Sequence, residues 1–219
     1  MAALKEDRPV PKLDPKLWVT TGAVALAAVL GWTAYVVTSN RASDVFAACR
    51  SGNVAGGAIG GPFQLVDETG QTVTDAQVFT KPALVYFGYA SCPDVCPLDN
   101  ARNVEVADIL AKQGAELTPV FISVDPARDT PAALAEYTDN FGPNLLGLTG
   151  SAEQINAAAK AYKVFFQIPE NADAAAGYAV DHTTVTYLVL PGLGFVDFFT
   201  RDATSDVIAE RAGCFLKSS

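Results

Sequence analysis

The sequence predicts an α/β domain, in which helices cover both faces of a mixed β-sheet, behind one N-terminal transmembrane helix. Two almost continuously apolar runs, at 83–89 and 118–125, have the pattern of strands buried on both faces. A helix-type pattern of apolar residues follows each of them, as in folds built from alternating strands and helices. A long uncharged run at 17–37 precedes the domain.

Composition limits the class of protein. Half of the 219 residues are apolar and 18% are charged, which excludes a disordered chain and fits one core with an accessory segment. The 15 basic residues against 24 acidic ones give a net charge of −9. Because this charge repels a phosphate backbone, it argues against a nucleic-acid partner.

The uncharged run 17–37 is about as long as the roughly 20 helical residues that cross a bilayer. Aromatic residues lie toward its ends and four basic residues precede it. We therefore expect a single-pass anchor, with residues 1–16 in the cytoplasm and the functional domain exported to the other side of the membrane. The alternative is a cleaved signal peptide, whose apolar region would be shorter.

The first elements follow the anchor in order. Residues 38–59 are rich in glycine and alanine and predict a tether to a folded domain over 60–219. Two short apolar stretches, 63–66 and 73–78, flank a turn and predict a β-hairpin. The helix after the first buried strand is expected over 95–112, because a glycine follows as a stop signal.

Capping patterns place the later helices. Thr130 followed by Pro131 predicts a helix that begins there and ends near Gly142. Ser151 and Gln154 form a capping-box pattern at the start of the next helix.

The last third of the domain carries mainly strand patterns. We expect a strand at 163–168, a surface excursion at 170–177, an antiparallel hairpin formed by 179–190 and 194–199, and a closing helix over 205–216. Right-handed crossovers between sequential parallel strands then give a thioredoxin-like architecture.

The four cysteines differ in position. Cys92 and Cys96 lie between the first buried strand and its helix, whereas Cys49 and Cys214 lie near the two ends of the exported domain. An exported domain meets an oxidising compartment, and chain termini are often close together in compact domains. Cys49 and Cys214 are therefore candidates for a disulfide bond. Four cysteines allow three pairings, and the sequence does not choose among them.

Cys92 and Cys96 lie at the carboxyl edge of the expected sheet, where open α/β folds place their sites. Because a helix N-terminus favours negative charge, we expect the pKa of both thiols to be lowered. The spacing of four, in place of the C-x-x-C of dithiol redox centres, stacks both side chains on one helical face and favours a metal ion. His182, the one histidine of the chain, is the candidate third ligand.

A set of two thiolates and an imidazole suits copper, because thiolates select Cu(I) and imidazole also binds Cu(II). Zinc accepts the same donors. The structural alternatives are a Cys92–Cys96 disulfide and an ordinary polar role for His182 in a loop. The segment 125–130 is most simply explained as a turn with a helix cap.

Four segments resemble a known family. They are similar, in order and spacing, to the SCO/SenC family of membrane-anchored copper proteins: GGPFQLVDETGQTVTD at 60–75, FGYASCPDVCP at 87–97, ISVDPARDTP at 122–131 and DHTT at 181–184. The resemblance implies a thioredoxin-like copper metallochaperone, rather than an enzyme, that is tethered to the inner membrane with its functional domain in the periplasm and works in cytochrome c oxidase assembly. It implies that Cys92, Cys96 and His182 bind one copper ion, as Cu(I) or Cu(II).

We expect the reduced dithiol to hold copper and to pass it by ligand exchange to the copper-receiving subunit of cytochrome c oxidase. Other copper or thiol-redox proteins are further candidate partners. A second hypothesis is a periplasmic thiol-disulfide oxidoreductase that reduces a partner's cysteines, with Cys92 and Cys96 as its redox-active pair. His182 separates the two hypotheses, because a reductase does not need it and a Cu(II) site does.

Overall fold

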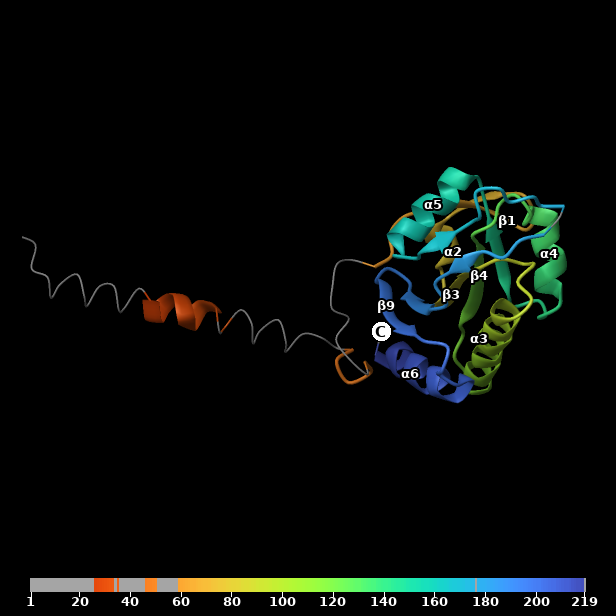
Figure 1. Cartoon of the computed structure of the whole chain (residues 1–219). Helices are drawn as coiled ribbons and strands as arrows, with labels where there is room; N and C mark the ends of the chain where they lie inside the picture. The colour runs from red at the N-terminus through yellow and green to blue at the C-terminus, as the bar shows by residue number, and fades with distance from the viewer. Residues whose placement is uncertain (1–25, 34, 36–45, 51–58, 176, 219) are drawn as a thin grey trace, which may run out of the picture. The chain divides into compact units, whose positions relative to one another are not determined.

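The computed structural model describes residues 26–33, 35, 46–50, 59–175 and 177–218 (Figure 1). The chain divides into two compact units, residues 1–47 and 48–219. In the first unit, residues 26–33 and 35 are helical and exposed. The rest of the predicted anchor, the tail and most of the tether lie outside the described residues. Among the described residues, no helix is both long enough and apolar enough to span a membrane.

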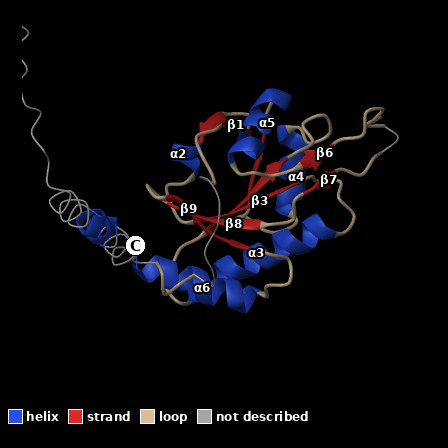
Figure 2. Cartoon of the chain, turned by 60° about the vertical axis from the view of Figure 1, so that its left-hand side comes forward, coloured by secondary structure: helices blue, strands red, loops and turns tan. Residues whose placement is uncertain are grey.

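The second unit is built on a seven-stranded mixed sheet (Figure 2). Its strands are β1 (Gln64–Asp67), β2 (Thr72–Thr74), β3 (Ala83–Gly88), β4 (Thr118–Ser123), β5 (Leu146–Thr149), β8 (Thr186–Leu190) and β9 (Gly194–Phe199). Their order in the sheet is β2-β1-β5-β4-β3-β8-β9. The central strands β3, β4 and β5 are parallel, whereas β1, β2, β8 and β9 pair antiparallel to their neighbours. The mixed sheet that the sequence predicts is thus confirmed.

Helices cover both faces of this sheet (Figures 1 and 2). On one face, α3 (Val95–Lys112) packs against α6 (Ser205–Ser218), and α4 (Pro131–Asp139) joins α3 through a hydrogen bond from Asn100 to Tyr137. The opposite face carries α5 (Ala152–Ala161), near the short helix α2 (Asp75–Val78). The arrangement is thioredoxin-like.

Strand β3 shows why its residues are apolar throughout. Successive side chains of a strand point to opposite faces. The Tyr86 hydroxyl lies 3.9 Å from the sulfur of Cys96 on α3, whereas the ring of Phe87 contacts Tyr162 at the end of α5. Every residue of β3 is buried because both faces are covered, as the sequence pattern predicts.

The predicted helix starts are confirmed. The hydroxyl of Thr130 accepts a hydrogen bond from the N–H of Ala133, and Pro131 is the first residue of α4. Ser151 and Gln154 form both bonds of a capping box at the start of α5. The expected helices over 95–112 and 205–216 correspond to α3 and α6.

Three short segments differ from the prediction. The second strand of the first hairpin ends at Thr74, after which Val78 belongs to α2. Strand β5 was not predicted, because it has four residues and includes Gly147. A Cβ atom at Gly147 would lie 3.0 Å from the Glu68 carboxylate and 3.1 Å from Thr138, so close packing accounts for the glycine.

The segment 163–168 contributes only the two-residue strand β6 (Phe166–Gln167). It pairs with β7 (Asp181–His182) in a separate two-stranded sheet, in which Phe166 lies opposite His182. His182 is therefore fixed by backbone pairing and does not lie in a simple loop.

Cys49 and Cys214 form a disulfide bond, with their Cα atoms 5.6 Å apart. The bond links positions 165 residues apart and joins the start of the second unit to α6. Cys92 and Cys96 are free thiols. Of the three pairings left open by the sequence, the structure has the one that leaves Cys92 and Cys96 free to bind a ligand.

Candidate metal centre

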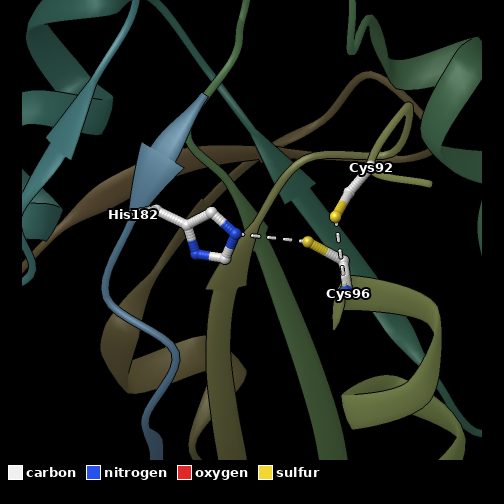
Figure 3. A group of neighbouring side chains, drawn as sticks. All are labelled: Cys92, Cys96 and His182. Atoms are coloured by element: carbon white, nitrogen blue, oxygen red, sulfur yellow. Dashed lines mark hydrogen bonds between the residues drawn. The ribbon is translucent and has the colours of Figure 1, made fainter. Parts of the chain in front are cut away.

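Cys92, Cys96 and His182 come from three separate elements and converge at one edge of the sheet (Figure 3). Cys92 lies in the turn after β3, Cys96 in the first turn of α3, and His182 on β7. Their ligand atoms all lie within 4.8 Å of one another. Among the histidines, cysteines and acidic residues that the structure describes, this is the one group with such a geometry.

The two cysteines do not share a helical face, which corrects the expectation from their spacing. Helix α3 begins only at Val95, so Cys92 precedes it. The sulfur of Cys92 accepts a hydrogen bond from the N–H of Cys96 at 3.5 Å and thereby satisfies one of the free N–H groups at the helix start. A turn, and not the helix repeat, brings the two sulfurs together.

The two thiols differ in acidity. Burial raises the pKa of Cys92, but hydrogen bonds from the backbone N–H groups of Cys96, Asp94 and Val95 outweigh it, and the net pKa is lowered. Burial raises the pKa of Cys96 far above its usual range, because this side chain is fully enclosed. The prediction of a lowered pKa is right for Cys92 and wrong for Cys96. At Cys96 the helix N-terminus, which lowers the pKa of a thiol, does not offset the rise in pKa that the loss of water around the sulfur causes.

His182 presents one ring nitrogen to the cysteines. Its Nδ1 lies 3.1 Å from the carbonyl of Thr183, and since a carbonyl only accepts, Nδ1 carries the hydrogen. The ring is then neutral, and its Nε2 carries a free lone pair that can bind a metal ion. This Nε2 lies 3.4 Å from the sulfur of Cys96 (Figure 3). Burial lowers the pKa of His182 more than the Thr183 hydrogen bond raises it, which keeps the imidazole neutral. The edge-to-face rings of Tyr86 and Tyr89 flank it at 6.1 and 5.8 Å.

The separations fit a metal ion. Bond lengths of about 2.3 Å to sulfur and about 2.0 Å to nitrogen, with angles between tetrahedral and trigonal, place the two donors about 3.5 to 3.7 Å apart. The observed distance of 3.4 Å between Cys96 Sγ and His182 Nε2 needs only a small adjustment. The sulfur of Cys92 lies within 4.8 Å of both of these atoms. These donors can hold a soft or borderline ion with three protein ligands.

The segment 125–130 supports the turn at 89–94, which carries Cys92 and is called the cysteine turn below. The sequence patterns do not predict this contact. The cap function of the segment is confirmed at Thr130. In addition, the carboxylate of Asp129 accepts hydrogen bonds from the N–H of Ala90 at 2.9 Å and from the Ser123 hydroxyl at 2.5 Å. The available signal was position: this segment follows β4, which lies beside β3, so both loops reach the same edge of the sheet.

Comparison with known proteins places this centre in a family. The SCO1/SenC family model matches residues 52–217. The chain belongs to the SCO1/SenC family. Within it, the SenC protein of Rhodobacter capsulatus is 54% identical over 205 residues, which cover 93% of this chain and 92% of SenC.

Solved structures of Sco proteins share the fold. Copper-bound ScoI of Arabidopsis thaliana is 39% identical and superposes with a TM-score of 0.67, over 74% of this chain and 98% of the other. BsSco, a member of the Sco family of cytochrome c oxidase assembly proteins in which a disulfide switch was identified, is 25% identical with a TM-score of 0.56. That match covers 70% of this chain and 91% of BsSco.

Proposed function

We propose that the chain binds one copper ion through Cys92, Cys96 and His182 and delivers it during assembly of cytochrome c oxidase. The observation that carries this proposal is the convergence of the three ligand atoms within 4.8 Å, from three separate elements. Two relatives support it: copper is bound in ScoI, and BsSco belongs to a family of oxidase assembly proteins.

The two sulfurs have different parts in holding the cargo. Cys92 is 7% exposed and Cys96 is fully buried, so an incoming thiolate of the receiving protein reaches Cys92 first. Metal binding requires deprotonated thiols and releases their protons. Because the pKa of Cys96 is raised, loading must displace a proton that this thiol otherwise keeps. Three protein donors leave a position for the incoming ligand, which suits transfer better than storage.

The N-terminal segment supports delivery at a membrane. In this proposal residues 17–37 anchor the chain in the inner membrane, residues 1–16 are cytoplasmic, and 38–59 tether a periplasmic domain over 60–219. The support is the uncharged length of the segment and the basic residues before it. Confinement to the membrane raises the effective concentration of the domain near a membrane-embedded oxidase, whose copper-receiving subunit is the proposed partner.

A second candidate function, thiol-disulfide exchange, is favoured by the unequal thiols. Cys92, the more exposed of the two thiols, has a lowered pKa, as an attacking thiol requires, and Cys96 lies close enough to resolve the mixed disulfide. In this reaction Cys92 and Cys96 lose two electrons and two protons and form a disulfide, while a partner's disulfide becomes two thiols. The same pair cannot hold copper while oxidised.

Copper loading tests the proposal. Full-length reduced protein, purified in detergent, is loaded with Cu(I) and with Cu(II), and stoichiometry and spectra are measured for C92A, C96A and H182A. Ser91→Ala and Asp181→Asn, at exposed neighbours of the ligands, are the matched controls.

We expect one ion per chain in the wild type and both controls, and lost or altered binding in each ligand variant. If H182A binds Cu(I) and Cu(II) as the wild type does, the three-donor site is wrong. Retained reduction of a partner's disulfide by that variant would then favour the oxidoreductase.

A further inference from the structure

We infer that Arg128 and Asp129 are positioning residues of the metal centre: they set the relative placement of the cysteine turn and His182 without touching the ion. The inference rests on the proposed copper function. It concerns the turn between β4 and α4, which sequence patterns explain only as a helix cap.

Asp129 holds the cysteine turn. Its buried carboxylate is 1% exposed and accepts the N–H of Ala90, two residues before Cys92. The hydroxyl of Ser123, at the end of β4, donates to the same carboxylate oxygen. Asp129 therefore links the backbone that carries Cys92, which follows β3, to the end of the neighbouring strand β4.

Arg128 reaches the histidine side of the centre through an aromatic ring. Its guanidinium carbon lies 5.4 Å from the centre of the Tyr89 ring, and Tyr89 in turn meets the ring of His182 edge to face at 5.8 Å. The carbonyl of Tyr89 also accepts the N–H of Cys92 at 3.2 Å. Tyr89 thus contacts both halves of the centre, and Arg128 lies behind it.

The guanidinium of Arg128 is itself held on two further sides. Its Nε pairs with the fully buried carboxylate of Asp125 at 2.5 Å, and its plane stacks on Tyr178 at 3.6 Å. The hydroxyl of Tyr178 donates to the same Asp125 at 2.7 Å. Within the described part of the chain, Nη2 of Arg128 is buried without a hydrogen-bond partner, so stacking takes precedence over hydrogen bonding there.

These contacts join three loops that are distant in sequence: the cysteine turn, the turn after β4, and the segment that leads into β7. Cys92 belongs to the first loop, Cys96 lies in the first turn of α3 directly after it, and His182 follows the third loop. A cluster that fixes the first and third loops relative to each other fixes the distance between sulfur and imidazole. Groups that orient metal ligands in this indirect way commonly change metal affinity by about 10-fold to 100-fold when they are removed.

The chain provides a matched control for this cluster. Arg211 on α6 pairs with the buried carboxylate of Asp197 at 2.5 Å and stacks on the ring of Phe199 at 4.7 Å. It has the same chemistry as the Arg128 pair, but within the described residues the contacts of Arg211, Asp197 and Phe199 do not include Cys92, Cys96 or His182.

The test compares Arg128→Met with Arg211→Met in the full-length protein. Cu(I) affinity is measured by competition with a chelator, Cu(II) geometry by electron paramagnetic resonance, and stability by urea unfolding of the metal-free protein. We expect both variants to lose stability. Only R128M should bind copper about 10-fold more weakly with an altered Cu(II) spectrum, while still taking up one ion. Arg128→Lys and Arg211→Lys replace the pair if the methionine variants do not fold.

Equal copper affinities and unchanged spectra in the two variants would overturn the positioning role while leaving the copper function intact. A wild-type protein that binds no copper, or an H182A variant that binds it as the wild type does, would instead overturn the copper function and this inference with it.

Discussion

Cys92 and Cys96 are four residues apart, and the fold gives their thiols opposite properties. Three backbone N–H groups lower the pKa of Cys92, while enclosure raises that of Cys96. The three candidate ligands could be predicted from residue type, from the position of the cysteines after a buried strand and from the single histidine, although the spacing wrongly suggested one shared helical face. The inequality of the thiols could not, because it depends on which sulfur the neighbouring side chains enclose.

This inequality predicts selective alkylation. In reduced, metal-free protein, iodoacetamide should modify Cys92 much faster than Cys96, because the thiolate is the nucleophile. The folded pKa of Cys92 is lowered, so its rate should rise with pH through a midpoint below the pKa of an ordinary free thiol. Peptide mass spectrometry over a range of pH gives both rates. Equal rates, or faster modification of Cys96, would contradict the assigned environments.

At the scale of elements, the end of β3 and the start of α3 are packed so closely that only glycine fits between them. A Cβ atom at Gly88 would lie 2.8 Å from the sulfur of Cys96 and 3.0 Å from the rings of Phe121 and Tyr86. Gly88→Ala should therefore displace Cys96, destabilise the fold by about 1 to 3 kcal/mol and weaken copper binding.

Gly213→Ala is the control for this variant. Gly213 lies within α6, and its new Cβ atom would meet Leu110 at an ordinary contact distance of 3.5 Å. It should leave copper binding unchanged and stabilise the helix by up to about 1 kcal/mol. Urea unfolding and copper titration measure both variants. Normal copper binding by G88A would refute the close packing of Cys96 against β3.

The elements that could be predicted are those with strong local signals. The apolar runs of β3 and β4 and the caps at Thr130 and Ser151 depend on nearby residues alone. Strand β5 was missed because four residues with a glycine carry little pattern. The pairing of β6 with β7 and the contact of Asp129 with the cysteine turn join distant segments, so no local pattern indicates them.

At the scale of the whole molecule, the Cys49–Cys214 disulfide closes the second unit at the edge away from the metal centre. Gly213, next to Cys214, faces Leu110 near the end of α3, whereas Cys96 lies in its first turn. Leu110 follows Cys96 by fourteen positions, a distance of roughly 20 Å along α3. The disulfide and the copper site should therefore act independently.

Replacing both Cys49 and Cys214 by serine should lower the free energy of unfolding by about 2 to 5 kcal/mol, because a long loop is no longer closed in the unfolded chain. Copper stoichiometry should stay at one ion per chain. Urea unfolding and copper analysis of the double variant check both statements. A loss of copper binding in the folded variant would show that the two ends of the unit are coupled.

X-ray absorption at the copper edge of the loaded protein counts the donor atoms around the ion and so tests directly whether Cys92, Cys96 and His182 bind it. The three-ligand site predicts two sulfur donors and one imidazole nitrogen donor from the protein, with the imidazole contribution lost in His182→Ala. A first shell without two sulfur donors, or one that is identical in wild type and H182A, would contradict copper binding by Cys92, Cys96 and His182.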